Sequence, residues 1–190
     1  MRLTILAAGA LLPLAACNQG PSTEESARQT GVIQLENASM EEVAKQSAAA
    51  ETKAPGQSAG QWEEGEQLVA LEAGGAPEEK VAPLKAEIGK PPRMRSGCRT
   101  AQDVKPFDVT QFPAMQSICR FPKFASKAGK VDAVMECTTP AGPSRVSISG
   151  TQGPNAYDLT MKRSMTMPGQ TKESSMTIRL TGKRLGACKA

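Results

Sequence analysis

Apolar and polar residues alternate along the last third of the chain, which is the pattern of a β-strand with one buried face. From position 157 to 167 the apolar side chains share one parity, broken at Arg163; they are Tyr157, Leu159, Met161, Met165 and Met167. The alternation returns with Met176, Ile178 and Leu180. A hairpin centred between Gln170 and Thr171 pairs Met165 with Met176 and Met161 with Leu180. The pattern therefore predicts two antiparallel strands in this register.

Further strands are predicted upstream of this hairpin. Two extended segments flank a turn near position 128, and a hairpin there places Cys119 opposite Cys137 and Phe121 opposite Met135. Another strand runs from Gly60 to about Glu72 and opens with the only tryptophan of the chain, Trp62. Consecutive antiparallel strands form a meander. We therefore expect a mainly β fold, α+β at most, whose meander is a curved sheet or a partly open barrel.

One helix is predicted ahead of these strands. Ser39 and Glu42 have the spacing of a capping box, which indicates a short N-terminal helix from Met40 to about Ala50. The apolar content of this helix is mostly alanine and its apolar stripe is narrow. We expect it to lie loosely on a surface or to dock on a partner.

The first residues have the layout of a secretory signal peptide. Arg2 is followed by an apolar run that ends in Leu14-Ala15-Ala16-Cys17, which resembles a bacterial lipobox. The run is too short to span a bilayer. The sequence predicts a lipoprotein signal peptide over 1–16 and acylation of Cys17, for example with palmitate; a plain signal peptide with a stray cysteine is the alternative. The membrane is then a partner through this lipid anchor.

Residue 18 bears on which membrane carries the anchor. In well-studied enteric bacteria an aspartate after the lipidated cysteine favours retention at the inner membrane, and this chain has Asn18. We therefore expect the protein in the cell envelope, anchored on the periplasmic side, at the outer membrane rather than the inner one. The remaining chain divides into a flexible tether over 17–30, a helix-containing extension over 31–55 and a β domain over 56–190.

Four cysteines remain once Cys17 is set aside: Cys98, Cys119, Cys137 and Cys188. An even number in an oxidising compartment predicts two disulfides, and four cysteines allow three pairings. The hairpin register favours Cys119 with Cys137, which leaves Cys98 with Cys188, but the other two pairings stay open. The chain has no histidine and no Cys-x-x-Cys spacing, so we expect no metal, no cofactor and no redox-active cysteine pair.

Charge is distributed unevenly along the chain. Residues 17–90 hold 13 acidic and 6 basic residues, a net of −7, and residues 91–190 hold 6 and 16, a net of +10. The basic half is suited to anionic head groups, or it is an ordinary solvated surface. The predicted location in the cell envelope and the 3% aromatic content argue against nucleic acid as a partner.

Several of these features together resemble a known family. They are Gly60-x-Trp62-Glu63, the four spaced cysteines, Tyr157 at the start of its strand, and the closing run from Gly182 to Cys188. The chain resembles, over roughly residues 56–190, the domain of unknown function 3617 family of proteobacterial envelope proteins. The resemblance implies the β domain and an envelope address and brings no established activity. We interpret Trp62 and Tyr157 as core anchors.

No catalytic constellation is visible in the sequence. Without histidine there is no Ser-His-Asp or Cys-His relay, so we expect no enzyme. We favour a structural or interaction lipoprotein that contacts an envelope protein. The alternative is a periplasmic binder of a lipid or other small hydrophobic ligand, lined by methionines that would otherwise fill the core, namely Met135, Met161, Met165, Met167 and Met176. An open apolar cavity would favour the binder, and a packed interior would exclude it.

Overall fold

The computed structural model describes residues 22–104, 113–140, 142–166 and 172–188. The predicted signal peptide over 1–16 and Cys17 lie outside these residues. The helices are α1 (Thr23–Thr30), α2 (Met40–Ala50), α3 (Glu78–Lys85) and α4 (Pro113–Ile118). The strands are β1 (Ile33–Ser39), β2 (Gly60–Glu72), β3 (Arg93–Arg99), β4 (Cys119–Lys127), β5 (Lys130–Thr139), β6 (Gly142–Gln152), β7 (Ala156–Met165) and β8 (Ser174–Gly186).

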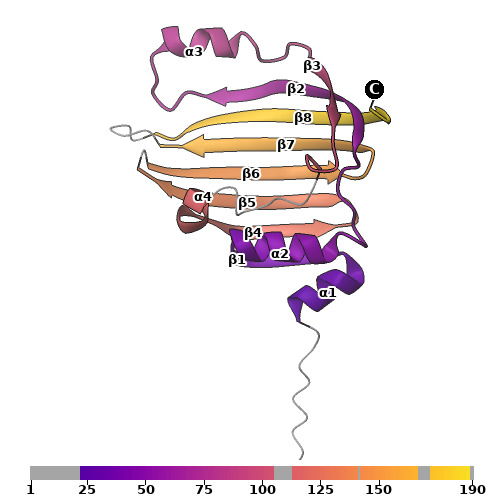
Figure 1. Cartoon of the computed structure of the whole chain (residues 1–190). Helices are drawn as coiled ribbons and strands as arrows, with labels where there is room; N and C mark the ends of the chain where they lie inside the picture. Colours follow the sequence, from indigo (N-terminus) through magenta and orange to yellow (C-terminus); the bar gives the residue numbers. More distant parts are fainter. Residues whose placement is uncertain (1–21, 105–112, 141, 167–171, 189–190) are drawn as a thin grey trace, which may run out of the picture.

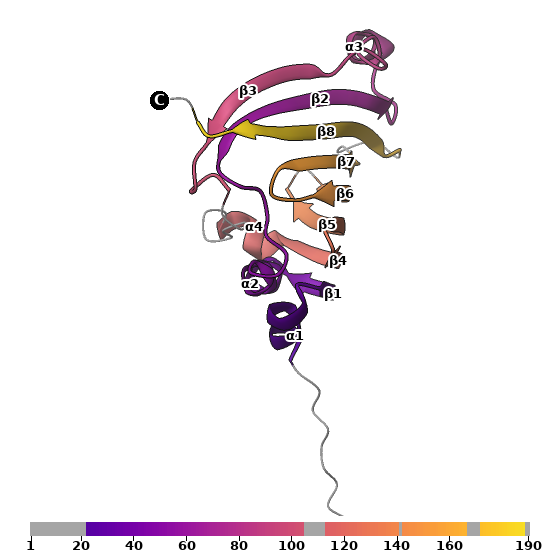
Figure 2. The same cartoon turned by 90° about the vertical axis from the view of Figure 1, so that its right-hand side faces the viewer.

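The strands form a single antiparallel sheet in the order β1-β4-β5-β6-β7-β8-β2-β3 (Figure 1). The stretch from β4 to β8 is a meander in which each strand pairs with the next. Figure 2 shows that the sheet is strongly curved and that its two edge strands, β1 and β3, do not meet. The predicted mainly β meander is confirmed, and it takes the form of an open curved sheet.

β7 and β8 pair two residues away from the predicted register. Met165 lies opposite Ser174, and Met161 lies opposite Ile178. The predicted partners, Met176 and Leu180, are therefore wrong. A shift of two residues leaves every side chain on its predicted face, because the side-chain period of a strand is two. The alternation fixed which face is apolar and could not distinguish these two registers.

Two disulfides cross-link the sheet in the pairing that the sequence favoured. Cys119 on β4 lies opposite Cys137 on β5, and their Cα atoms are 4.0 Å apart. Cys98 on β3 is bonded to Cys188, just after β8, across a sequence separation of 90 residues. Because β2 lies between β3 and β8, this second disulfide bridges over a strand and ties the edge of the sheet to the C-terminus.

A β-bulge follows the first disulfide on β4. The pairing with β5 shifts between Arg120 and Lys123, so Phe121 and Pro122 together face Met135. Phe121 and Met135 thus stay neighbours, as predicted, and both pack against the disulfide. Bulges bend a strand and increase its local twist.

The N-terminal segment differs from the prediction. Residues 23–30, predicted as part of the flexible tether over 17–30, form α1, so the tether prediction is wrong there. Ser22 caps the helix by accepting a hydrogen bond from a first-turn backbone N–H at 3.2 Å, and Gly31 ends it in the left-handed conformation. Ala27 is fully buried between β1 and α2. The two caps and the buried contact of Ala27 therefore stabilise α1, although this helix has no broad apolar stripe.

The extension predicted over 31–55 belongs to the same sheet as the rest of the chain. β1 pairs with β4 along its length, so the predicted domain boundary at residue 56 is not a structural boundary. The predicted helix is confirmed as α2, with both halves of its capping box formed by Ser39 and Glu42. It does not lie loosely on the sheet, because Met40 and Val43 are 1% and 5% exposed.

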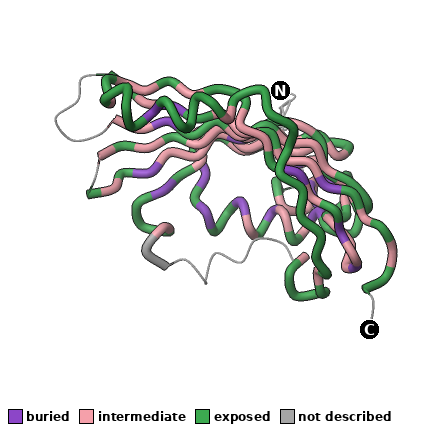
Figure 3. Tube along the Cα trace, turned by 90° about the horizontal axis from the view of Figure 1, so that it is seen from above, coloured by how far each residue is buried: buried purple, intermediate pink, exposed green. Residues whose placement is uncertain are grey.

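The buried core is small and divided. Figure 3 shows short buried stretches separated by half-buried and exposed ones. The two largest fully buried side chains are Trp62 on β2 and Met40 on α2. Met40 packs on the Cys119–Cys137 disulfide, whereas Trp62 belongs to the opposite half of the sheet. Between them the concave face is only partly covered, and that is where the candidate site lies.

Candidate functional site: an apolar groove on the concave face

The concave face of the sheet carries the apolar side chains of its central strands. Residues paired across adjacent strands share a face, and Ala133, Ile148 and Met161 form one such row. The opposite face is polar and carries cross-strand ion pairs; for example, the Arg179 Nε donates to the Asp158 Oδ1 at 2.9 Å. The sheet therefore has one apolar face that needs a cover.

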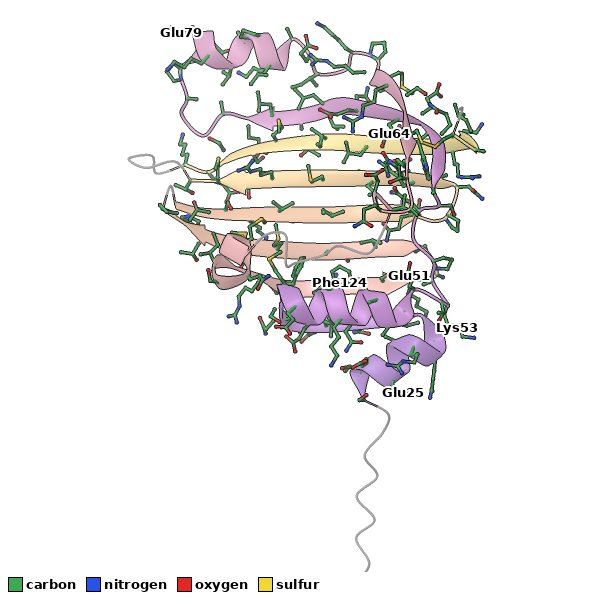
Figure 4. The ribbon with its side chains drawn as sticks, in the orientation of Figure 1. Glu25, Glu51, Lys53, Glu64, Glu79 and Phe124 are labelled. Carbon is green, nitrogen blue, oxygen red and sulfur yellow. A yellow bond between two sulfur atoms is a disulfide. The ribbon has the colours of Figure 1, made fainter. Side chains whose placement is uncertain are left out.

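α2 and α4 cover this face at the β1–β4 end of the sheet (Figure 2). A groove of about 650 Å³ remains between the helices and the strands. Ala44 of α2, Phe124 of β4, Val146 of β6 and Leu159 of β7 are among its walls. Figure 4 labels Phe124 beside α2. The groove thus combines side chains from α2 and from five strands of the sheet, β1 and β4 to β7.

The two ends of the groove differ in polarity. Met115 and Met135 line one end, close to the buried disulfide. Gln57, Gln152 and Asp103 line the other end, where β6 finishes. Hydrogen bonds from the Thr100 side chain and backbone lower the pKa of the Asp103 carboxyl, so this group is a partnered anion. The groove is therefore suited to a molecule with one apolar and one polar end.

The methionines do not line the site as the ligand-binding alternative predicted. Of the five named for that role, Met135 lines the groove and Met167 lies outside the described residues. Met161 and Met165 are only half-buried, and Met176 is 37% exposed, so they do not form a filled core either. The reason is the position of α2, which packs on β1 and β4 at one end of the sheet, away from β7 and β8 (Figure 1).

Trp62 and Tyr157, the two predicted core anchors, lie together beyond the polar end of the groove. Trp62 is completely buried, and its Nε1 donates to the Ser58 carbonyl oxygen at 2.9 Å. The two ring centroids are 5.9 Å apart. The Tyr157 ring lies directly on Gly182, where a Cβ would come within 2.1 Å of it. Glycine is required at that position because any side chain would displace the ring.

Charged side chains complete this aromatic cluster. The Tyr157 hydroxyl donates to the Glu64 Oε1 at 2.6 Å. The guanidinium of Arg99 lies 5.3 Å from the Trp62 ring centroid and 5.7 Å from that of Tyr157, and it donates to Glu64 and Gln57. Gln57 also lines the groove, so the cluster borders its polar end. Because these polar groups form hydrogen bonds with one another, we interpret the cluster as a structural support for the polar end of the groove.

Tyr157 and Glu64 shift each other's pKa in opposite directions. Burial, followed by the hydrogen bond to Glu64, raises the pKa of Tyr157 to about 12. Burial also acts to raise the pKa of Glu64, but the hydrogen bond from Tyr157 and the charges of Arg99 and Arg95 outweigh it and lower that pKa. The pair is therefore stable as neutral tyrosine and ionised glutamate over a wide pH range.

Stability is expected to fall as pH rises from about 10 to about 12 because of Tyr157. In that window the unfolded chain, with an ordinary tyrosine pKa, has lost the hydroxyl proton that the folded chain still holds. Urea unfolding of the protein and of Tyr157→Phe across this window measures the effect. The variant should show the shallower decline, and equal declines in both proteins would contradict the assignment.

The sequence identified part of this cluster and missed the rest. Trp62 and Tyr157 were named, whereas Glu64, Arg99 and Gln57 were not. Glu64 has the same strand parity as Trp62, which was a usable signal that both face the same side. No local sequence pattern predicted that Arg99 lies over the two rings, because β3 comes close to them only through its pairing with β2.

Within the described residues, no three acidic, cysteine or histidine side chains gather closely enough to hold a metal ion. No helix of the described ranges is both long enough and apolar enough to cross a membrane. The four described cysteines are all joined in disulfides.

Residues 55–188 match the family model of a protein of unknown function, DUF3617. The chain belongs to the DUF3617 family. The DUF3617 match starts just before β2 and ends at Cys188, so it includes both disulfides and the aromatic cluster. No curated protein and no solved structure matches the chain.

The DUF3617 match leaves out α1, β1 and α2. β1 and α2 nevertheless supply groove walls, including Ile33, Val43 and Ala44. The family match therefore covers the strands β2 to β8 and the cysteine framework and brings no activity with it. The covered groove depends on the N-terminal part that lies outside the family match.

Proposed function

We propose that this DUF3617 protein is an envelope lipoprotein that holds a small hydrophobic ligand in the groove beneath α2 and catalyses no reaction on it. Ligand sites commonly measure about 300–1,000 Å³ and have mostly apolar walls with a few placed polar groups. The groove, at about 650 Å³, lies within that range and has its polar groups gathered at one end. This groove is the observation that carries the proposal.

The proposed location in the cell envelope rests on the lipobox around Cys17. Acylation of that cysteine would supply the membrane anchor, and Asn18 favours the outer membrane. α1 begins at Thr23, so the chain between it and the lipidated cysteine spans at most about 20 Å. That length would keep the groove near the bilayer surface. A hydrophobic ligand could then pass between the membrane and the protein over a short path, and no cofactor is needed for such a role.

A second candidate function is docking on an envelope protein. Leu84 and Ile88 at α3 and Met94 on β3 are 47%, 38% and 56% exposed. β3 is also an edge strand, whose free backbone groups can pair with a strand of another protein. Exposed apolar side chains beside an open edge favour this role, which is compatible with a filled groove.

Native mass spectrometry tests the ligand-binding proposal. The chain from residue 18 onward, secreted into a periplasm and purified without refolding, should carry a reproducible extra mass that organic solvent removes. The remaining mass should equal the sequence value minus four hydrogens, because two disulfides form. If the protein is found only at this mass, without bound ligand, the binding function is contradicted.

Two substitutions on β6 test whether the ligand lies in the groove, one inside the groove and one control outside it. Ile148 faces the groove, and Ile148→Glu would put a charge among apolar walls, so the extra mass should disappear. Ser149 is exposed on the opposite face of β6, and Ser149→Glu should retain it. An extra mass that survives in Ile148→Glu would place the ligand somewhere other than the groove.

A further inference from the structure

A second cavity adjoins the polar end of the groove. It measures about 460 Å³ and lies between the turn that follows α2 and the β4–β5 hairpin turn. The cavity and the groove share the wall residues Ala54, Ser126 and Gln152. Because the two spaces meet at these residues, one elongated molecule can occupy both, with different chemical groups in each.

The second cavity is positively charged. Lys53 and Lys127 are the ionisable side chains among its walls, and both are exposed. Neither forms an ion pair with any residue that the structure describes. By contrast, Lys123 on the same strand as Lys127 pairs with Asp132. Two unpaired ammonium groups around a cavity without a carboxylate favour an anionic ligand group.

Glu51 adds to this arrangement. It lines the groove at the C-terminal end of α2, and Lys53 follows it on the connection to β2 (Figure 4). The Glu51 carboxylate repels an anion within the groove, whereas Lys53 attracts one in the second cavity. The two charges therefore favour a ligand whose anionic head passes beyond Glu51.

We propose that the ligand is a single-chain anionic phospholipid, with its acyl chain in the groove and its glycerol phosphate head between Lys53 and Lys127. This inference rests on the proposed function and specifies its ligand. The second cavity, about 460 Å³, has the volume of about 15 water molecules in the liquid, which exceeds what a bare carboxylate fills. The groove, about 650 Å³, has the volume of about 20, which suits one chain.

Two matched lipids test the proposal on the delipidated chain from residue 18 onward. Palmitoyl-glycerol phosphate and palmitoyl-glycerol differ only in the phosphate, and their affinities are measured by calorimetry below their micelle concentrations. The phosphate form should bind about tenfold more tightly, the ratio that one charge-assisted contact supplies. In the double variant Lys53→Gln, Lys127→Gln this ratio should fall to about one, while the affinity for palmitoyl-glycerol stays unchanged.

Lys130 provides the control. It lies opposite Lys127 in the hairpin, is exposed and lines neither cavity, so Lys130→Gln should keep the tenfold preference. Equal binding of both lipids by the unaltered protein would overturn the head-group site and leave the groove intact. Palmitate binding as tightly as the phosphate lipid would overturn the assignment of a glycerol phosphate head. Binding of none of the three would refute the proposed function itself.

Discussion

Replacing Trp62 by alanine is expected to lower the free energy of unfolding by about 3–5 kcal/mol. The side chain is completely buried, contacts the Tyr157 ring and lies under the Arg99 guanidinium. Its removal leaves a cavity beside the Tyr157 ring and the Arg99 guanidinium. Domains of this size are stable by only about 5–15 kcal/mol, so the variant should be largely unfolded at modest urea concentrations.

The measurement is urea unfolding followed by far-ultraviolet circular dichroism, because Trp62 is the only tryptophan and its fluorescence is lost in the variant. Trp62→Phe is the control, since it keeps an aromatic ring and loses the hydrogen bond to the Ser58 carbonyl. It should lose about 1–2 kcal/mol. A loss below about 1 kcal/mol in Trp62→Ala would show that the cluster is not the anchor of this half of the sheet.

The strand pattern predicted the sheet because alternation is a local property. Each run of apolar residues fixes which face of its own strand is buried, and the faces were correct on β7 and β8 despite the wrong register. The register depends on the turn that joins the strands and on cross-strand packing. Met161 opposite Ile178 buries the same kind of surface as Met161 opposite Leu180, so hydrophobicity does not separate the two pairings.

The N-terminal elements were harder to predict because long-range contacts stabilise them. The pairing of β1 with β4 brings together residues far apart in the chain, which no local pattern indicates. α1 had local signals that were available, namely Ser22 as a cap and Gly31 as a stop. Its residues are nevertheless small or polar, as in a tether, and only Ala27 is buried.

The groove could not have been predicted from residue patterns. Alternation shows that the concave face is apolar, but a volume depends on how closely the covering elements approach it. α2 carries small residues such as Ala44 and Ser47 toward the sheet, and these leave space where larger ones would fill it. The narrow alanine stripe that suggested a loosely held helix is thus the feature that keeps the groove open.

The disulfide between Cys98 and Cys188 is expected to stabilise the fold more than the one between Cys119 and Cys137. Their sequence separations are 90 and 18 residues. In the chain-entropy model, closing loops of these lengths contributes about 4.5 and about 3 kcal/mol to the free energy of unfolding. The double serine variants, Cys98→Ser with Cys188→Ser and Cys119→Ser with Cys137→Ser, compared by urea unfolding, measure the difference.

The comparison separates chain entropy from packing, because burial ranks the two disulfides in the reverse order. Cys119 and Cys137 are 6% and 8% exposed and pack against Met40, whereas Cys98 and Cys188 are exposed. If the variant lacking the longer loop loses about 1.5 kcal/mol more, restriction of the unfolded chain dominates. If the variant lacking the buried disulfide loses more, its contact with α2 dominates, and that same variant should then also lose groove binding.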